Sequence, residues 1–374
     1  MLRIKIDNID FEVAEGLTIM DVARDAGIHI PSLCFSDRLP HYSSCMVCMV
    51  KDKRTGNFLP SCSALVQNGM DLESASENVL TIRKKSVELL LSEHRAECEA
   101  QCKVVCPEGY DIPLMNRFIS AIDLDGAVSL SLSQTKFSGL KCFDCKGYCE
   151  NACRRKKVDT PVSIRNMQMF VYGQIKKSPE QNSRDVECNV PTSGRNEQGD
   201  SRLTRQKASK RFSSRIGTIE QSELKEWLKG CKNDLSRFRE ITNFESASQE
   251  SESCMHCDCR AAVDCKLRLL ADELAVKDPK GKLVNSPIQK KININTGLIF
   301  ENAKCIKCGL CVRLCEELKE EPALCFINRG FISIISEPLT EDFDNILKTR
   351  SKEVVDICPT GALSMRTPTA SADL

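Results

Sequence analysis

The feature that most restricts how this chain can fold is its cysteine content. Residues 305–315, CIKCGLCVRLC, place four thiols within eleven positions. The 374 residues include 23 cysteines, whereas aromatic residues make up only 5%. With so few large apolar side chains, we expect packing to be supplemented by disulfides or by bound metal. The length suits about two to four modest domains, and the net charge of +1 indicates no general attraction to nucleic acid or lipid.

The sequence favours metal over disulfides. Its start, MLRIKIDNIDFEVAEG, lacks a basic stub followed by an apolar run, so no signal peptide is expected. No stretch reaches the roughly 18 apolar residues that a membrane span needs. We therefore predict a cytoplasmic protein without direct membrane insertion. In a reducing compartment thiolate–metal bonds are favoured over disulfides.

The first 78 residues have the pattern of a small β-grasp domain. Residues 2–13 alternate apolar and polar positions around Asp7-Asn8, which predicts a hairpin. Thr18 is expected to cap a helix that ends at Gly27. Asn68-Gly69 is interpreted as a second hairpin turn.

Beyond this domain, helical patterns alternate with cysteine-rich loops. Residues 76–94 predict a helix capped by Ser76, with a solvated basic face at Arg83–Lys85. The polar segment after residue 177 lacks the aromatic residues typical of nucleic-acid sites and is interpreted as a linker. The predicted divisions are a β-grasp domain (1–78), a bridging helix (79–97), a helical cysteine-rich domain (98–177), a linker (178–215), a short helical segment (216–250), a C-terminal cysteine-rich domain (251–366) and a frayed tail (367–374).

The first cysteine group lies in the N-terminal domain. Its spacing, C-x10-C-x2-C-x13-C, has the C-x2-C pair and distant fourth thiol of plant-type ferredoxins, but a longer first gap. The sequence segments GIHIPSLCF, SSCMVCMV and PSCSALVQNGM resemble the N-terminal domain of the large iron–sulfur subunit of respiratory complex I and of iron-only hydrogenases. The resemblance implies a 2Fe-2S cluster, with zinc as the alternative, on Cys34, Cys45, Cys48 and Cys62.

The segment from VELLLSEHRAEC onward resembles two different families, one after the other. VELLLSEHRAEC is similar to the same complex I subunit, in which a histidine before a cysteine ligates a 4Fe-4S cluster. From there the words CPEGYDIPLMNRFI and CKGYCENACRRKKVDTPVSIR resemble the helical iron–sulfur domain of the glutamate synthase small subunit and dihydropyrimidine dehydrogenase. That domain holds two 4Fe-4S clusters. The resemblance implies that one cluster binds Cys98, Cys102 and Cys153, with His94 as its fourth ligand. It implies that the other cluster binds Cys106, Cys145 and Cys149. The fourth ligand of that second cluster would be Cys142, with Gln168 as a competing candidate.

A further group, CMHCDCRAAVDCKL, has the spacing C-x2-C-x-C-x5-C, which no common rule covers. It predicts another 4Fe-4S cluster. Zinc and a role in completing a neighbouring cluster are the alternatives. The thiols are Cys254, Cys257, Cys259 and Cys265.

The C-terminal group has the bacterial ferredoxin pattern. A C-x2-C-x2-C run is followed at a distance by the C-P of VVDICPTGAL. The arrangement also resembles the complex I subunit and implies a 4Fe-4S cluster on Cys305, Cys308, Cys311 and Cys358. Cys315 is interpreted as a structural thiol, and Cys188, Cys231 and Cys325 are also unassigned. We hypothesise that Lys304, Lys307 and Arg313 raise the potential of this cluster.

The absent motifs complete the prediction. The sequence contains no G-x-G-x-x-G, no P-loop, no nucleophile elbow and no H-E-x-x-H, so no bound flavin or nicotinamide and no catalytic residue is expected. The predicted fold class is α+β multidomain: a β-grasp 2Fe-2S domain, an α-helical two-cluster 4Fe-4S domain and a C-terminal ferredoxin-like 4Fe-4S domain.

The expected function is that of an electron-transfer subunit. One 2Fe-2S and three to four 4Fe-4S clusters would relay single electrons between a flavoprotein, NAD(P)H-linked in the resembled families, and a ferredoxin, hydrogenase or dehydrogenase partner. Two alternatives remain open. One is a redox enzyme with substrate chemistry at an incompletely ligated cluster, and the other is a zinc-rich scaffold.

Overall fold

The computed structural model describes residues 1–40, 42–94, 98–135, 142, 144–177, 240–276 and 290–366. They form two compact units. The first draws on Met1–Arg95, Asp264–Pro287 and Glu301–Leu363, and the second on Ala96–Val263, Ile288–Phe300 and Ser364–Leu374. The predicted linker, the predicted helix EQSELKEWLKGC and the predicted tail lie outside the described residues.

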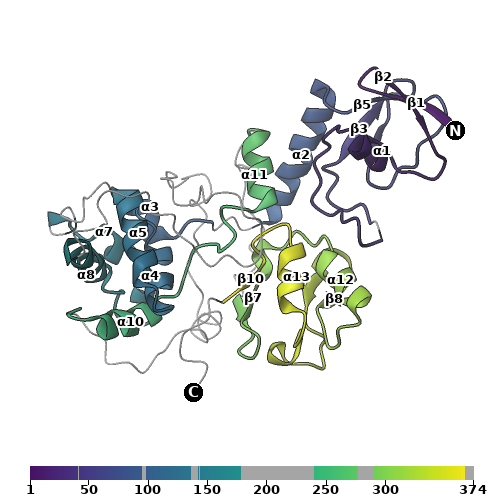
Figure 1. Ribbon diagram of the computed structural model, residues 1–374. Helices are drawn as coiled ribbons and strands as arrows, with labels where there is room; N and C mark the ends of the chain where they lie inside the picture. Colours follow the sequence, from purple (N-terminus) through teal and green to yellow (C-terminus); the bar gives the residue numbers. More distant parts are fainter. Residues whose placement is uncertain are drawn as a thin grey trace. The chain divides into compact units, whose positions relative to one another are not determined.

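The first unit begins with a five-stranded sheet (Figure 1). Asp7 and Asn8 have φ values of 50° and 69°, as a two-residue type I′ turn requires, so the predicted hairpin is confirmed. The strand order is β2-β1-β5-β3-β4, with bounds Leu2–Ile6 (β1), Ile9–Val13 (β2), Met49–Asp52 (β3), Phe58–Pro60 (β4) and Asp71–Glu73 (β5).

The helix predicted after Thr18 is α1 (Ile19–Asp25). Thr18 accepts a hydrogen bond from the Asp21 backbone, and the Asp21 side chain accepts one from Thr18 N, which is a capping box. Ile19, Val22 and Ala23 are buried in the same apolar core as the sheet residues. The helix and its cap are therefore confirmed.

The second predicted hairpin is wrong. Gly69, at φ 77°, donates its N–H to Arg3 O at 2.6 Å, and Arg3 N donates to Asn68 Oδ1 at 2.9 Å. The turn leads into β5, which pairs in parallel with β1 rather than antiparallel with the strand before it. The left-handed glycine was identified correctly, but a local pattern does not specify which strand the chain pairs with next.

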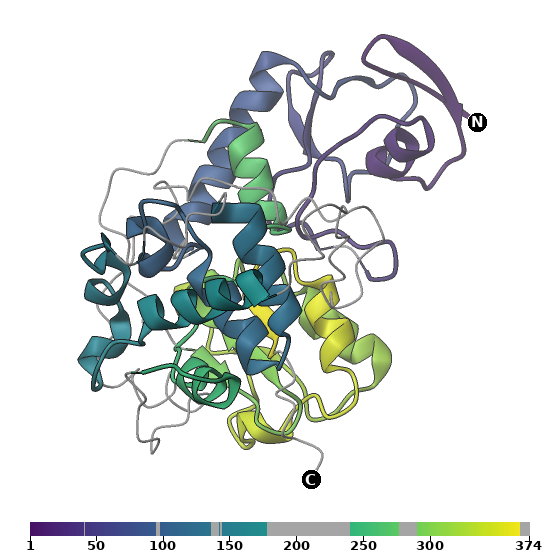
Figure 2. The same cartoon turned by 60° about the vertical axis from the view of Figure 1, so that its left-hand side comes forward.

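The helix α2 (Glu77–Glu93) begins after Ser76 as predicted, although the Ser76 side chain makes no capping hydrogen bond. The expected solvated basic face is wrong at Arg83, which is only 3% exposed. Its Nε and Nη2 donate to Met49 O at 3.2 and 2.9 Å. Helix α11 (Lys266–Glu273) lies beside α2, as both views show (Figures 1 and 2).

The rest of the first unit is built around the C-terminal cysteine run. Helices α12 and α13 pack together in it. Its elements are η5 (Asn302–Lys304), α12 (Leu310–Leu318), β8 (Cys325–Ile327), η6 (Gly330–Ile332), β9 (Ile334–Ser336), η7 (Phe343–Asn345) and α13 (Ser351–Ile357), with β8 and β9 antiparallel.

The second unit is mainly helical. Its core packs Met115 and Ile119 of one helix against Leu130, Met167 and Ala247 of others. Its elements are α3 (Gln101–Val105), α4 (Ile112–Ser120), α5 (Leu124–Thr135), α7 (Tyr148–Asn151), η1 (Arg154–Lys157), α8 (Ile164–Lys177), α10 (Phe244–Glu252) and a sheet in the order β10-β7-β6 (Leu363–Met365, Leu298–Glu301, Lys290–Ile292).

The predicted α+β class is confirmed, and the sheets of the described residues are small and open. Within the described ranges, the helices are all too short or too polar to cross a bilayer.

Candidate metal centres

The four N-terminal thiols lie together in the first unit. All are at most 3% exposed. Hydrogen bonds join Cys45 to Cys34, Cys34 to Cys62 and Cys62 to Cys48, so the sulfur atoms form one connected group. The hydrogen bonds from Cys45 and Cys62 lower the pKa of Cys34. The same hydrogen bonds raise the pKa of Cys45 and the pKa of Cys62. The hydrogen bond from Cys62 lowers the pKa of Cys48 to about 6.

The loop around these thiols supplies hydrogen-bond donors. Ser43 Oγ is 3.3 Å from Cys62 Sγ, and the Val47 backbone donates to Cys45. The buried Arg83 guanidinium is close enough to Cys48 for the two charges to interact. Donors and cations around converging thiols stabilise the negative charge of a thiolate-bound cluster. The donor set therefore fits a 2Fe-2S cluster.

The C-terminal thiols form a second group in the same unit. Burial raises the pKa of Cys305 and of Cys308 to about 12, and neighbouring Cys358 adds to both shifts. Burial is also the main reason why the pKa of Cys311 is raised. The charges of Cys305, Cys358 and Cys308 raise it further. Lys307 N donates to Cys305 Sγ at 3.3 Å, in a loop where Lys307 and Gly309 have φ values of 55° and 73°. These left-handed residues turn backbone N–H groups toward sulfur.

The three cations near this run have different partners. Lys304, 4% exposed, forms an ion pair with Glu301, and Lys307 Nζ lies 3.3 Å from Glu93 Oε2. Arg313 is 7% exposed and has no carboxylate partner in the described part of the chain. Of the three, Arg313 is the one for which the described residues provide no carboxylate partner.

The Arg313 side chain joins the two cysteine groups of the first unit. Its Nη2 donates to Cys34 O at 3.2 Å and to Cys308 O at 3.3 Å, and its Nε donates to Gly309 O at 3.3 Å. Its Nη1 donates to Pro40 O. Cys34 also lies near enough to raise the pKa of Cys308. The N-terminal and C-terminal groups are therefore adjacent.

The second unit brings together Cys106, Cys142, Cys145 and Cys149. Burial and then the charges of Cys106 and Cys145 raise the pKa of Cys142 to about 11. Burial, Glu150 and Cys106 raise the pKa of Cys149 to about 12. Cys142 Sγ donates to Gln168 Oε1 at 2.6 Å, so both candidates for the fourth ligand lie at this group.

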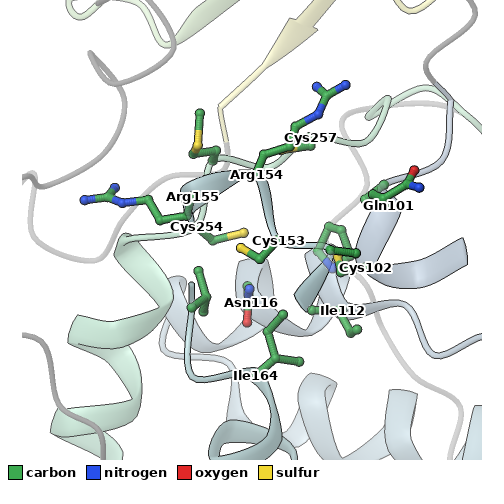
Figure 3. Close-up of a pocket in the computed structure, with 15 residues that line it drawn as sticks. Gln101, Cys102, Ile112, Asn116, Cys153, Arg154, Arg155, Ile164, Cys254 and Cys257 are labelled. Carbon is green, nitrogen blue, oxygen red and sulfur yellow. The ribbon is translucent and has the colours of Figure 1, made fainter. Parts of the chain in front are cut away.

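A pocket in the second unit contains four more thiols (Figure 3). Cys102 and Cys153, predicted to share a cluster, both line it, whereas Cys98 does not. Cys254 and Cys257 line the same pocket. Cys153 and Cys254 point their sulfur atoms toward each other, with Asn116 of α4 beneath them (Figure 3).

The remaining predicted ligands are all buried. His94 ends α2 and Cys265 precedes α11, both in the first unit. Cys98 and Cys259 are neighbours in the second unit, where Cys259 N donates to Cys98 O at 3.1 Å. Metal binding by these four residues stays a prediction.

Among the described residues, no three His, Cys, Asp or Glu side chains are arranged to hold a single metal ion. Asn116, Arg83 and Ser43 were not predicted from the sequence, because an isolated asparagine, arginine or serine carries no spacing signal.

Three family models match separate parts of the chain. Residues 1–77 match a 2Fe-2S iron-sulfur cluster binding domain. Residues 82–180 match the 4Fe-4S cluster domain II of dihydropyrimidine dehydrogenase. Residues 298–364 match the ferredoxin-like domain of NADH-quinone oxidoreductase subunit 3. The chain therefore carries one 2Fe-2S domain and further 4Fe-4S domains, as the resemblances implied.

Curated relatives are similar over about a third of the chain or less. The mitochondrial NADH-ubiquinone oxidoreductase 78 kDa subunit of Candida albicans is 29% identical over 116 residues, which are 31% of this chain and 15% of the relative. The NADPH-Fe(3+) oxidoreductase subunit alpha of Geobacter sulfurreducens is 33% identical over 116 residues, 31% of this chain and 13% of the relative. The NADP-reducing hydrogenase subunit HndD of Solidesulfovibrio fructosivorans is 38% identical over 103 residues, 26% of this chain and 18% of the relative. The chain thus matches less than a fifth of each relative's length.

Among solved structures, an NAD+-reducing [NiFe]-hydrogenase in the H2-reduced state aligns with 99% of this chain and 90% of its own, at 15% identity and a TM-score of 0.48.

Proposed function

We propose that this chain of three iron–sulfur domains is an electron-transfer subunit, relaying single electrons between a flavoprotein and a catalytic or ferredoxin partner. The partner class is suggested by the relatives, whose names describe NADH-, NADPH- and NADP-linked oxidoreductase subunits. The chain itself would bind neither flavin nor nicotinamide. Both would belong to the partner.

The proposed ligand sets follow the thiol groups. Cys34, Cys45, Cys48 and Cys62 would hold the 2Fe-2S cluster. Three 4Fe-4S clusters would complete the relay, one of them on Cys305, Cys308, Cys311 and Cys358. A second would bind Cys106, Cys145 and Cys149, with Cys142 favoured as fourth ligand because a thiolate is a softer donor than the Gln168 amide.

The observation that carries the proposal is the Arg313 bridge. One buried guanidinium bonds the carbonyl groups of both Cys34 and Cys308, which belong to different ligand sets. Two clusters held by these loops would be separated only by the arginine and the ligands themselves. A relay needs such short gaps, whereas a scaffold of independent metal sites does not.

The test uses the full chain purified anaerobically. NADPH or NADH is added first alone and then with a flavin-containing diaphorase, while the visible iron–sulfur absorbance is followed. We expect bleaching only after the flavoprotein is added. Bleaching by a nicotinamide alone would show that this chain takes up hydride itself, and a lack of bleaching with both would contradict the relay.

A further inference from the structure

The CMHC segment at residues 254–257 lies beyond the match to the 4Fe-4S cluster domain, which ends at residue 180. The structure nevertheless places it inside the helical unit. Cys254 and Cys257 line the pocket that Cys102 and Cys153 also line. The four thiols come from three separate segments of chain: Cys102 lies in α3, Cys153 follows α7, and Cys254 and Cys257 follow α10.

We propose that Cys102, Cys153, Cys254 and Cys257 together bind one 4Fe-4S cluster. The C-x2-C pair thus completes a site in the helical domain instead of forming a cluster with Cys259 and Cys265. On binding, four S–H bonds are replaced by four Fe–S bonds, and the thiol protons pass to solvent. This proposal rests on the proposed function in one respect: that the four thiols bind an iron–sulfur cluster and not another metal that prefers thiolate ligands.

The four thiols influence one another electrostatically. Burial raises the pKa of Cys102 well above its usual value, and the charges of Cys254, Cys257 and Cys153 add to the shift. Burial raises the pKa of Cys257 to about 12, with Cys254 and Cys153 contributing and Arg154 opposing. Cys149 of the other thiol group also contributes to the shift of Cys102, so these effects show only that the thiols are near one another, and the shared pocket lining shows which of them face one space.

The pocket walls suit a buried cluster. Ile112, Pro113, Val162 and Ile164 contribute apolar side chains to its lining. Asn116 lines the same pocket and is fully buried. Neither its amide nitrogen nor its amide oxygen has a hydrogen-bond partner in the part of the chain that the structure describes. A buried amide without a partner is costly, so its N–H groups point to an acceptor such as a cluster sulfide.

The CMHC loop is held in place by buried cations. Lys290, 2% exposed, donates from Nζ to Met255 O and His256 O, each at 3.3 Å. Arg117 binds both carboxylate oxygens of Asp258 at 2.9 and 2.8 Å. His256, at φ 45°, donates its backbone N–H to Cys254 Sγ at 3.5 Å. The Arg117–Asp258 pair is neutral overall, whereas the buried Lys290 ammonium beside the loop of Cys254 and Cys257 favours an anionic cofactor in the pocket.

The test is an iron and sulfide count on the full chain, isolated without oxygen. One variant carries Cys102→Ala and Cys153→Ala, a second carries Cys254→Ala and Cys257→Ala, and a third carries all four changes. Each variant should lose about four irons per chain, and the fourfold variant should lose no more than either pair. A loss of about eight irons in the fourfold variant would place the two pairs on different clusters and overturn the proposal. So would an unchanged count in the Cys254/Cys257 variant, or stoichiometric zinc released with that pair.

The matched control is Cys325→Ala, in β8, which should keep the full iron count. Retention of the 2Fe-2S paramagnetic signal checks that the chain still folds. If the paired variants fail that check, Asn116→Leu provides an independent measurement. It should lower the midpoint potential of one 4Fe-4S signal and leave the others unchanged, whereas no shift would contradict a cluster in this pocket. Correct iron counts without electron transfer from the flavoprotein would overturn the proposed function and leave this site intact.

Discussion

Replacing Arg313 by glutamine should lower the midpoint potentials of two clusters together. The guanidinium lies 3.2 Å from Cys34 O and 3.3 Å from Cys308 O. Adding the covalent span of a cysteine from carbonyl oxygen to sulfur puts the charge roughly 7 Å from either cluster. At that distance, with an effective dielectric constant of about 20, a unit charge interacts with one electron by about 2.4 kcal/mol. Because about 1.4 kcal/mol corresponds to 59 mV for one electron, each midpoint should fall by about 100 mV.

The assay is a potentiometric titration followed by electron paramagnetic resonance, on the wild-type chain and on Arg313→Gln. The control is Lys307→Gln, because Lys307 is 36% exposed and already paired with Glu93, so its loss should change either midpoint little. Iron counts must stay at the wild-type value, since Arg313 also ties the loops together. A shift in only one of the two signals, or equal shifts in both variants, would refute the reasoning. Of the three cations in the sequence-based hypothesis, Lys304, Lys307 and Arg313, we therefore expect Arg313 to have the largest effect on the midpoint potential.

Three further outcomes are expected. Ser43→Ala removes the hydroxyl that lies 3.3 Å from Cys62 Sγ. In the same titration, the 2Fe-2S midpoint potential should fall by tens of millivolts, which corresponds to about 1 kcal/mol or less. Ser36→Ala is the control and should leave this potential unchanged. Arg117→Met should destabilise the second unit by about 3–5 kcal/mol in urea unfolding, because Asp258, 8% exposed, would keep a buried charge without its partner; a change under about 1 kcal/mol would contradict this. Cys311→Ser should abolish one 4Fe-4S signal and spare the 2Fe-2S signal, and loss of both would show that the two sites do not form independently.

The sequence was most informative where ligands and supporting backbone are close along the chain. The C-x2-C pair of Cys45 and Cys48, the run at Cys305–Cys311 and the turn at Asp7-Asn8 are local features, and thiolate spacing or turn chemistry limits them to few structures. The family matches at residues 1–77 and 298–364 agree with the resemblances that were based on these short sequence segments.

The tertiary structure alone decided which distant segments meet. The sequence could not show that Asn68-Gly69 leads into a parallel strand, because strand pairing depends on the whole sheet. It could not show that Arg83 is buried against Met49, because a long cationic side chain has the same helical pattern in either environment. Nor could it show that the thiols of Cys254 and Cys257 enter the pocket of Cys102 and Cys153. Sulfur atoms on separate segments become neighbours only through packing of the helices that carry them, and no local spacing encodes that packing.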